Sequence, residues 1–196
     1  MQFVFDKIID GNLVYMDCLR DILGCTPRNT MIDLGCHKAA HTPLFGFKQR
    51  KYIDILPNVL DFPDEQQYFE QGDILNTPLD VHYDVSFAQD VIEHLTVENG
   101  IKLINIMKHI SDKQILFTPS TDLFGMDYET DNPESHRSLW SPEMVEQFFP
   151  NEFIFICFPK YHSVWNGGAF FLYSLKDNIK QEFIRIGNEL NKYSWA

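Results

Sequence analysis

The stretch "TMIDLGCHKAAHT", from Thr30 to Thr42, carries the strongest fold signal in the sequence. Its short apolar run ends at Asp33 and Gly35, as a buried strand does where it enters a tight turn. In an open parallel sheet, ligands bind beyond the carboxyl ends of the strands, so a cofactor site is expected at this turn. The turn has one glycine, whereas a nicotinamide cofactor needs a glycine-rich approach to its pyrophosphate. The stretch therefore favours a different nucleotide cofactor.

Outward from this stretch, short apolar runs alternate with helical patterns. Further strands are predicted at 51–56, 83–88 and 114–117, and a helix is predicted at 97–110, where apolar residues cover a broad face. Such alternation is typical of βαβ units around a mainly parallel sheet. The expected fold class is α/β, with a Rossmann-like, doubly wound sheet.

The end of the chain has a different pattern. Ser141 is a good helix N-cap before Pro142, which predicts a short helix over 142–149. Two apolar runs then begin at Phe153 and Gly168, separated by the turn-prone "NGG" at 166–168. Two strands joined without a helix predict an antiparallel C-terminal hairpin at one edge of a mixed, seven-stranded sheet.

Length and composition predict a single domain. The chain has 196 residues, of which 44% are hydrophobic, and this is enough for one substantial core. We expect one domain over 1–196, with an N-terminal helical segment at 1–27, a core at 28–175 and a C-terminal helix at 176–196. The four cysteines form no CxxC pair, and no apolar run is long enough for a leader or a membrane span. A cytoplasmic protein is expected.

The charge restricts the partners. Sixteen basic and 28 acidic residues give a formal net charge of -12, which disfavours binding to the phosphate backbone of a long nucleic acid. A small molecule is the expected partner. The composition indicates no oligomeric state.

Two carboxylates follow the next predicted strands. Asp54 stands about 20 residues after Gly35, where an acidic side chain can accept both hydroxyl groups of a ribose. Asp73, in "EQGDIL", follows the probable third strand. Both are expected at the same edge of the sheet as the Gly35 turn.

The ordered strings "MIDLGC", "YIDIL", "GDIL", "YDVSFAQDVIEHL", "ILFTPS" and "HRSLWSPEM" resemble the motifs of class I S-adenosylmethionine-dependent methyltransferases over roughly residues 28–175. The resemblance implies S-adenosylmethionine as the cofactor and places its binding residues at the turn and at the following strand ends. Gly35 would lie under the methionine part, Asp54 would bind the ribose, Asp73 and Ile74 would meet the adenine, and Gln89 would lie beside the methionine end. The full implied set is Asp33, Gly35, Cys36, His37, Asp54, Ile55, Asp73, Ile74, Gln89 and Asp90.

The opening loop departs from the family pattern. His37 and Ala39 stand where family members commonly have glycine. Histidine tolerates a positive φ better than most residues, so the loop can hold the cofactor if the His37 side chain points to solvent. The alternative is a catalytically degenerate protein that keeps the methyltransferase fold only for binding.

The string "QDVIEHL" places Asp90, Glu93 and His94 at helical spacing, and His136 follows in the connection after the next strand. Two carboxylates with two imidazoles suit Mg, Mn or Zn. The constellation resembles that of ubiquinone-pathway O-methyltransferases and small-RNA 2'-O-methyltransferases, in which the residues matching Glu93, His94 and His136 hold a divalent metal. Asp90, a further possible ligand, would replace a glutamate and is one methylene shorter.

Two roles therefore remain open for the histidines. His94 or His136 can act as the general base that takes one proton from the acceptor, or a metal bound at Glu93, His94 and His136 can lower the pKa of the acceptor hydroxyl. A third reading gives both histidines only structural hydrogen bonds or a place in the wall of the acceptor pocket. The expected reaction is methyl transfer from S-adenosylmethionine to an oxygen or nitrogen atom of a small molecule.

Overall fold

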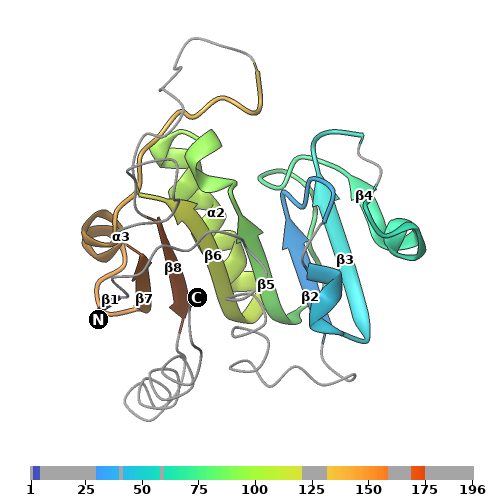
Figure 1. Ribbon diagram of the computed structural model, residues 1–196, viewed down its shortest axis with the longest axis horizontal. Coiled ribbons are helices and arrows are strands. Elements are labelled where there is room, and N and C mark those ends of the chain that lie inside the picture. The colour runs from blue at the N-terminus through green and yellow to red at the C-terminus, as the bar shows by residue number, and fades with distance from the viewer. Residues whose placement is uncertain are drawn as a thin grey trace.

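The protein is built around one sheet (Figure 1). The computed structural model describes residues 2–4, 30–39, 42–57, 60–120, 132–158 and 169–174. In these residues eight strands are hydrogen-bonded in the order β1-β7-β8-β6-β5-β2-β3-β4. Their bounds are β1 Gln2–Val4, β2 Thr30–Leu34, β3 Gln49–Asp54, β4 Phe69–Gln71, β5 Tyr83–Gln89, β6 Ser111–Pro119, β7 Phe153–Phe158 and β8 Ala169–Ser174.

The strand order creates a switch point between β2 and β5. The chain runs from β2 outward to β3 and β4, and then returns to pair β5 with the other side of β2. These pairings are parallel, as is that of β5 with β6, so the carboxyl ends of the strands share one edge. Ligands of such sheets bind at the edge where the strand order reverses.

One face of the sheet is covered by α2, Val97–Ile110. The helix begins after Thr96, whose hydroxyl accepts a hydrogen bond from the Asn99 N–H at 3.3 Å, a standard N-cap. Its buried residues, Leu103, Ile104, Met107 and Ile110, lie three or four apart and pack in the main core cluster.

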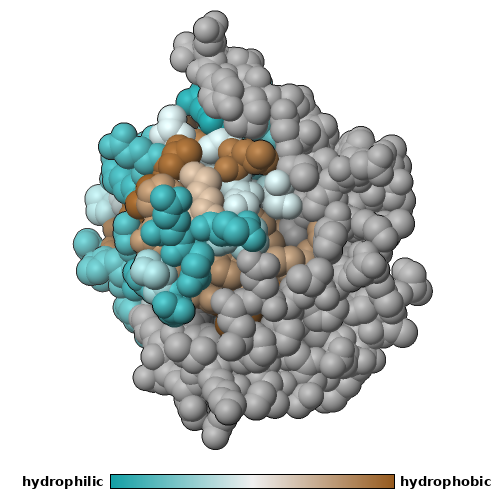
Figure 2. Space-filling model, turned by 90° about the vertical axis from the view of Figure 1, so that its left-hand side faces the viewer, coloured by the Kyte–Doolittle hydropathy of each residue, from teal (hydrophilic) through white to brown (hydrophobic). Residues whose placement is uncertain are grey.

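The same core extends to α3, Pro142–Phe148. The Ser141 hydroxyl accepts from the Met144 N–H at 3.2 Å, and Pro142 occupies the first turn, as the sequence predicts. Figure 2 views the side of the molecule on which α3 lies, and shows hydrophobic residues surrounded by hydrophilic ones among those coloured.

The opposite face is packed by aromatic rings. Phe45 stacks on Phe87 of β5 with ring centroids 5.0 Å apart, and Phe47 meets both rings edge-on at 6.5 and 6.0 Å. Phe45 ends the 3-10 helix η1, Thr42–Phe45. The chain between β2 and β3 therefore contributes to the core without forming a long helix.

Several expectations need correction. The sheet has eight strands in the described residues, against the seven predicted. The extra strand β1 lies within the segment 1–27 that was expected to be helical, and it pairs in parallel with β7. Three residues that pair with a distant strand give no local periodicity, which is why the pattern missed them.

The C-terminal strands also lie differently from the expectation. β8 pairs antiparallel with both β7 and β6, so it is an interior strand and the pair is not at the edge of the sheet. Residues 159–168, which connect β7 to β8, lie outside the described residues, so the hairpin turn stays a prediction. The predicted C-terminal helix at 176–196 and the predicted N-terminal helical segment at 1–27, apart from β1, also lie outside them.

In the described part of the chain, no helix is long and apolar enough to cross a membrane.

Candidate active site at the switch point

The turn after β2 depends on its glycine. Gly35 has φ +75°, and its N–H donates to the Ile53 carbonyl at 2.8 Å, as the Cys36 N–H does at 3.1 Å. A Cβ on Gly35 would lie 2.6 Å from Val91 Cγ2, a distance that side chains do not adopt. The conformation and the close approach of Val91 both require glycine here.

Asp54 holds the loop that follows the turn. Its Oδ2 accepts a hydrogen bond from the His37 N–H at 2.7 Å, and its Oδ1 accepts one from the Leu56 N–H at 2.8 Å. The residue is 7% exposed and ends β3 beside the switch point. The predicted ribose-binding carboxylate thus also organises the Gly35 turn. Each of its oxygens keeps a second lone pair for a ligand.

Two residues of the loop that are not glycine adopt left-handed backbone conformations. His37 has φ +45° and Ala39 has φ +50°. The His37 side chain is exposed, which meets the condition set for a loop open to a ligand, whereas Ala39 is buried. The βαβ units expected from the sequence imply a helix after this turn, but η1 is the only helix in the described residues between β2 and β3. Within the described part of this connection, no α-helix N-terminus therefore faces a ligand.

The acidic group of Asp33 is buried beneath the turn. Burial raises its pKa to about 7, the negative charge of Asp54 adds to this rise, and the Thr42 hydroxyl, which donates to Asp33 Oδ2 at 2.5 Å, opposes it. Cys36 is also buried, and burial raises the pKa of its thiol, so it is not a thiolate at neutral pH.

Ile55 from the implied cofactor set, and Asp73 and Ile74, implied for the adenine, differ in exposure. Ile55, just after β3, is 54% exposed and offers an apolar surface at the ligand edge. Ile74 is instead part of the core cluster. The Asp73 carboxylate accepts from the Leu75 N–H at 2.9 Å and from Asn76 Nδ2 at 2.6 Å, so it already stabilises its own turn.

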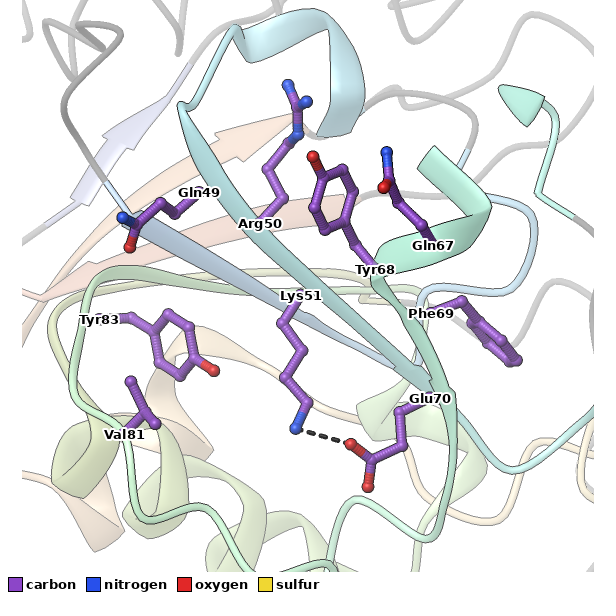
Figure 3. Close-up of a pocket in the computed structure, with 9 residues that line it drawn as sticks. All are labelled: Gln49, Arg50, Lys51, Gln67, Tyr68, Phe69, Glu70, Val81 and Tyr83. Atoms are coloured by element: carbon purple, nitrogen blue, oxygen red, sulfur yellow. Dashed lines mark ion pairs between the residues drawn. The ribbon is translucent and has the colours of Figure 1, made fainter. Parts of the chain in front are cut away.

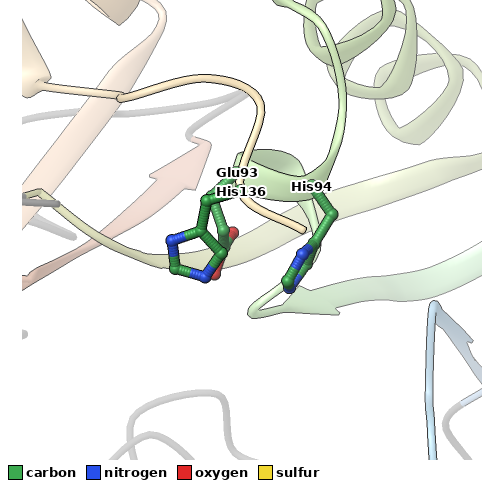
Figure 4. A group of neighbouring side chains, drawn as sticks. All are labelled: Glu93, His94 and His136. Carbon is green, nitrogen blue, oxygen red and sulfur yellow. The ribbon is translucent and has the colours of Figure 1, made fainter. Parts of the chain in front are cut away.

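A second group of side chains lies after β5. Glu93 and His94 belong to the 3-10 helix η3, Ile92–His94, and His136 approaches them from the connection after β6 (Figure 4). One ligand atom of each residue lies within 4.8 Å of those of the others. The two imidazole rings meet edge to face, with centroids 4.9 Å apart. The structure thus brings together the three residues named from the sequence.

Asp90 lies near enough for its charge to act on Glu93, but it is not one of the three converging residues. It has φ +51°, is exposed, and precedes η3, so it does not share a helical face with Glu93 and His94 as expected. Its carboxylate accepts from Gln89 Nε2 at 3.4 Å. Asp90 is not among the residues whose ligand atoms converge.

The protonation of the cluster is set by its burial. Burial raises the pKa of Glu93, and the nearby charge of Asp90 raises it further, although the Thr118 hydroxyl donates to Glu93 Oε2 at 3.0 Å. Burial lowers the pKa of His94, as does the charge of His136. His94 is therefore a neutral imidazole at neutral pH, able to accept a proton or to bind a metal.

Two residues that donate hydrogen bonds to carboxylates of the candidate site were not identified from the sequence. Thr42 and Thr118 lie inside the quoted motifs, yet a threonine in a motif gives no sign of which carboxylate it contacts. Their roles depend on the register that brings Thr42 to Asp33 and Thr118 to Glu93.

A separate pocket lies at the other edge of the sheet (Figure 3). Its volume is about 380 Å³, and its lining includes the first residues of β3 and β4 and Tyr83 at the start of β5. Its cations are paired: Lys51 with Glu70 and Arg50 with Glu65, each at 2.7 Å. Ligands of parallel sheets bind at the carboxyl ends, so the switch point is the better candidate.

Comparison with solved structures shows the α/β methyltransferase fold. Magnesium protoporphyrin IX methyltransferase from Synechocystis PCC 6803, with bound SAH, matches at a TM-score of 0.60 and 14% identity, over 83% of this chain and 82% of that one. The 1,6-didemethyltoxoflavin-N1-methyltransferase from Burkholderia thailandensis matches at 0.63 and 13% identity, over 83% and 76%. A putative methyltransferase from Bacillus halodurans C-125 matches at 0.61 and 11% identity, over 83% and 99%.

Comparison of sequences gives less evidence about the family than comparison of structures. No protein-family model matches the chain. The male gametocyte surface protein P230p of Plasmodium falciparum is 32% identical over 96 residues, which are 45% of this chain and 4% of that protein. The chain thus matches only a small fraction of the length of this relative.

Proposed function

We propose that the protein transfers a methyl group from S-adenosylmethionine to an oxygen or nitrogen atom of a small-molecule acceptor. The observation that carries the proposal is Asp54, which ends β3 at the switch point and holds the backbone of the Gly35 turn through the His37 N–H. This arrangement joins a ribose-binding carboxylate to a tight turn at the ligand edge of the sheet.

The residues present fit this cofactor better than a dinucleotide. A pyrophosphate is stabilised by a helix N-terminus, and between β2 and β3 the described residues provide only η1. The turn is bordered instead by the carboxyl groups of Asp33 and Asp54, which suit a ligand that carries positive charge. The exposed Ile55 would pack against a flat base, and Gly35 keeps the backbone close to the site. When bound, S-adenosylmethionine supplies an activated methyl group.

On the acceptor side, His94 and His136 are the candidate bases. Methyl transfer to an oxygen or nitrogen atom would release one proton from the acceptor, and a group of the protein would have to take that proton. The neutral His94 ring is one group that could take that proton. The buried Glu93 and the ring of His136 bound the same space.

Titration calorimetry with S-adenosylmethionine and S-adenosylhomocysteine tests the donor half. We expect binding in the micromolar range, weakened about tenfold or more by Asp54→Asn, since a hydrogen bond to a charged group is worth about 1.5–3 kcal/mol. Asp61→Asn, which changes an exposed carboxylate, is the matched control. The absence of binding at millimolar ligand would reject the proposal. Binding without transfer to any acceptor in a metabolite screen would favour the degenerate binding protein.

A divalent metal is the second candidate for the acceptor side. Glu93, His94 and His136 provide a carboxylate and two imidazoles, a donor set that suits Mg, Mn or Zn, and the metal would lower the pKa of an acceptor hydroxyl. Manganese binding followed by paramagnetic resonance tests this without an acceptor. Glu93→Gln and His136→Ala should each weaken binding at least tenfold. If the parent binds no manganese, the histidines act as bases alone.

A further inference from the structure

The connection that carries His136 is fastened to η3 through the main chain of Glu93. The Arg137 N–H and the Ser138 N–H both donate to the Glu93 carbonyl, at 2.7 and 3.0 Å. These two donors follow His136 directly in the chain. The backbone that follows His136 is therefore hydrogen-bonded to Glu93, the residue whose side chain lies beside the His136 ring.

The Ser138 side chain attaches the His136 connection to η3 and to the residue after it. Its hydroxyl lies 2.7 Å from the Leu95 carbonyl and 3.2 Å from the Ile92 carbonyl, the residues that flank Glu93 and His94. Ser138 is 3% exposed, so water does not compete for these bonds.

Trp140 fixes the direction of the hydroxyl. Its indole N–H donates to Ser138 Oγ at 2.7 Å, which leaves the hydroxyl proton to point to the two carbonyls. The ring is fully buried, and it approaches α2 so closely that a Cβ on Gly100 would lie 2.2 Å from Trp140 Cζ2. A glycine inside a helix costs about 0.5–1 kcal/mol relative to alanine, and here it makes room for the indole.

We propose that Ser138 is a positioning residue that sets the separation of His136 from Glu93 and His94. The inference rests on the proposed function for its catalytic meaning, because these three side chains form the acceptor side of that site. The structural part of the inference does not depend on that function: the hydroxyl of Ser138, oriented by Trp140, joins the His136 connection to η3. Without it, the His136 connection loses its side-chain attachment to η3 at Ser138, while the main-chain bonds to the Glu93 carbonyl remain.

Histidine-labelled full-length protein tests this by nuclear magnetic resonance, with no cofactor or acceptor needed. The edge-to-face rings of His94 and His136 should give a ring-to-ring cross-peak in the parent. In Ser138→Ala its intensity should fall roughly threefold or more, which corresponds to a loosening of about 1 Å. Ser138→Cys keeps nearly the same volume in the buried space while forming weaker hydrogen bonds, so it should show the same loss in a folded protein.

Ser141→Ala is the matched control. It removes a hydroxyl from the same connection and uncaps α3, so it should lower stability while leaving the cross-peak intact. The affinity for S-adenosylhomocysteine should stay within about twofold in the Ser138 variants, because the Ser138 side chain bonds to η3 and to Trp140 and not to the residues of the Gly35 turn. A parental cross-peak in both Ser138 variants overturns the inference, whether or not the parent binds the cofactor.

Discussion

Removal of the Asp54 carboxylate should weaken the fold as well as any ligand binding. The carboxylate accepts one hydrogen bond from His37, in the loop after β2, and one from Leu56, just beyond β3. Asp54→Ala deletes both acceptors at once. The loop after the Gly35 turn then loses its side-chain attachment to the neighbouring strand.

The size of the effect follows from these two bonds. A hydrogen bond to a charged group is worth about 1.5–3 kcal/mol. His37 is exposed and Leu56 is half-buried, so water can reach the freed N–H groups, and the lower end of that range applies to each. The free energy of unfolding should therefore fall by about 3 kcal/mol.

Urea denaturation followed by circular dichroism measures this loss. With a urea dependence of about 2 kcal/mol/M, the midpoint should fall by about 1.5 M. Asp61→Ala, at an exposed position, should change the free energy of unfolding by less than about 0.5 kcal/mol. A midpoint for Asp54→Ala within about 0.3 M of the parent would refute the reasoning, because the two bonds would then contribute nothing measurable.

Four further variants probe the same turn. His37→Gly should raise the free energy of unfolding by about 1 kcal/mol by relieving a left-handed residue, and should leave S-adenosylhomocysteine affinity unchanged in calorimetry; a loss of affinity would mean that the side chain contacts the ligand. Gly35→Ala should cost about 2–4 kcal/mol in urea denaturation, and adding Val91→Ala should restore part of it by removing the overlapping methyl groups. Asp33 has a native pKa of about 7 against 3.8 for an unperturbed carboxyl group, so the native state binds more protons between these values, and stability falls as pH rises through that window, by up to about 1.4 kcal/mol per pH unit. Asp33→Asn should flatten this fall in denaturation curves measured across the window, and an unchanged slope would contradict the assignment.

The elements that sequence predicts well are those with strong local signals. The helix predicted at 97–110 matches α2, because the Thr96 cap and the apolar positions of one face agree on its start and its orientation. Two strands are also recognised, because their apolar runs end at a turn residue: β2, which begins at Thr30, and β3, which ends at Asp54. Within such segments, local propensity and tertiary packing favour the same structure.

The features that sequence misses depend on distant contacts. The expected helix after Gly35 is absent from the described residues, where Pro43 and Gly46 accompany a short 3-10 helix whose Phe45 packs on β5. In the candidate site, the meeting of Glu93, His94 and His136 follows from motif order, whereas the Ser138 attachment does not. A serine forms such a bond only when the fold supplies the carbonyl groups, and its neighbours in the chain do not reveal them.

The position of β8 has a consequence for how the sheet is assembled during synthesis. In the described sheet, β7 is joined to the other strands only through β8, and β1 only through β7. Gln2 pairs with Phe155, so β1 leaves the ribosome long before the strand with which it pairs. The strands from β2 to β6 have their partners earlier, and pairings between segments distant in sequence form slowly. We therefore expect a nascent chain to hold a partial sheet whose open β6 edge is closed only when Ala169–Ser174 emerges, and an exposed strand edge of that kind favours association with other chains.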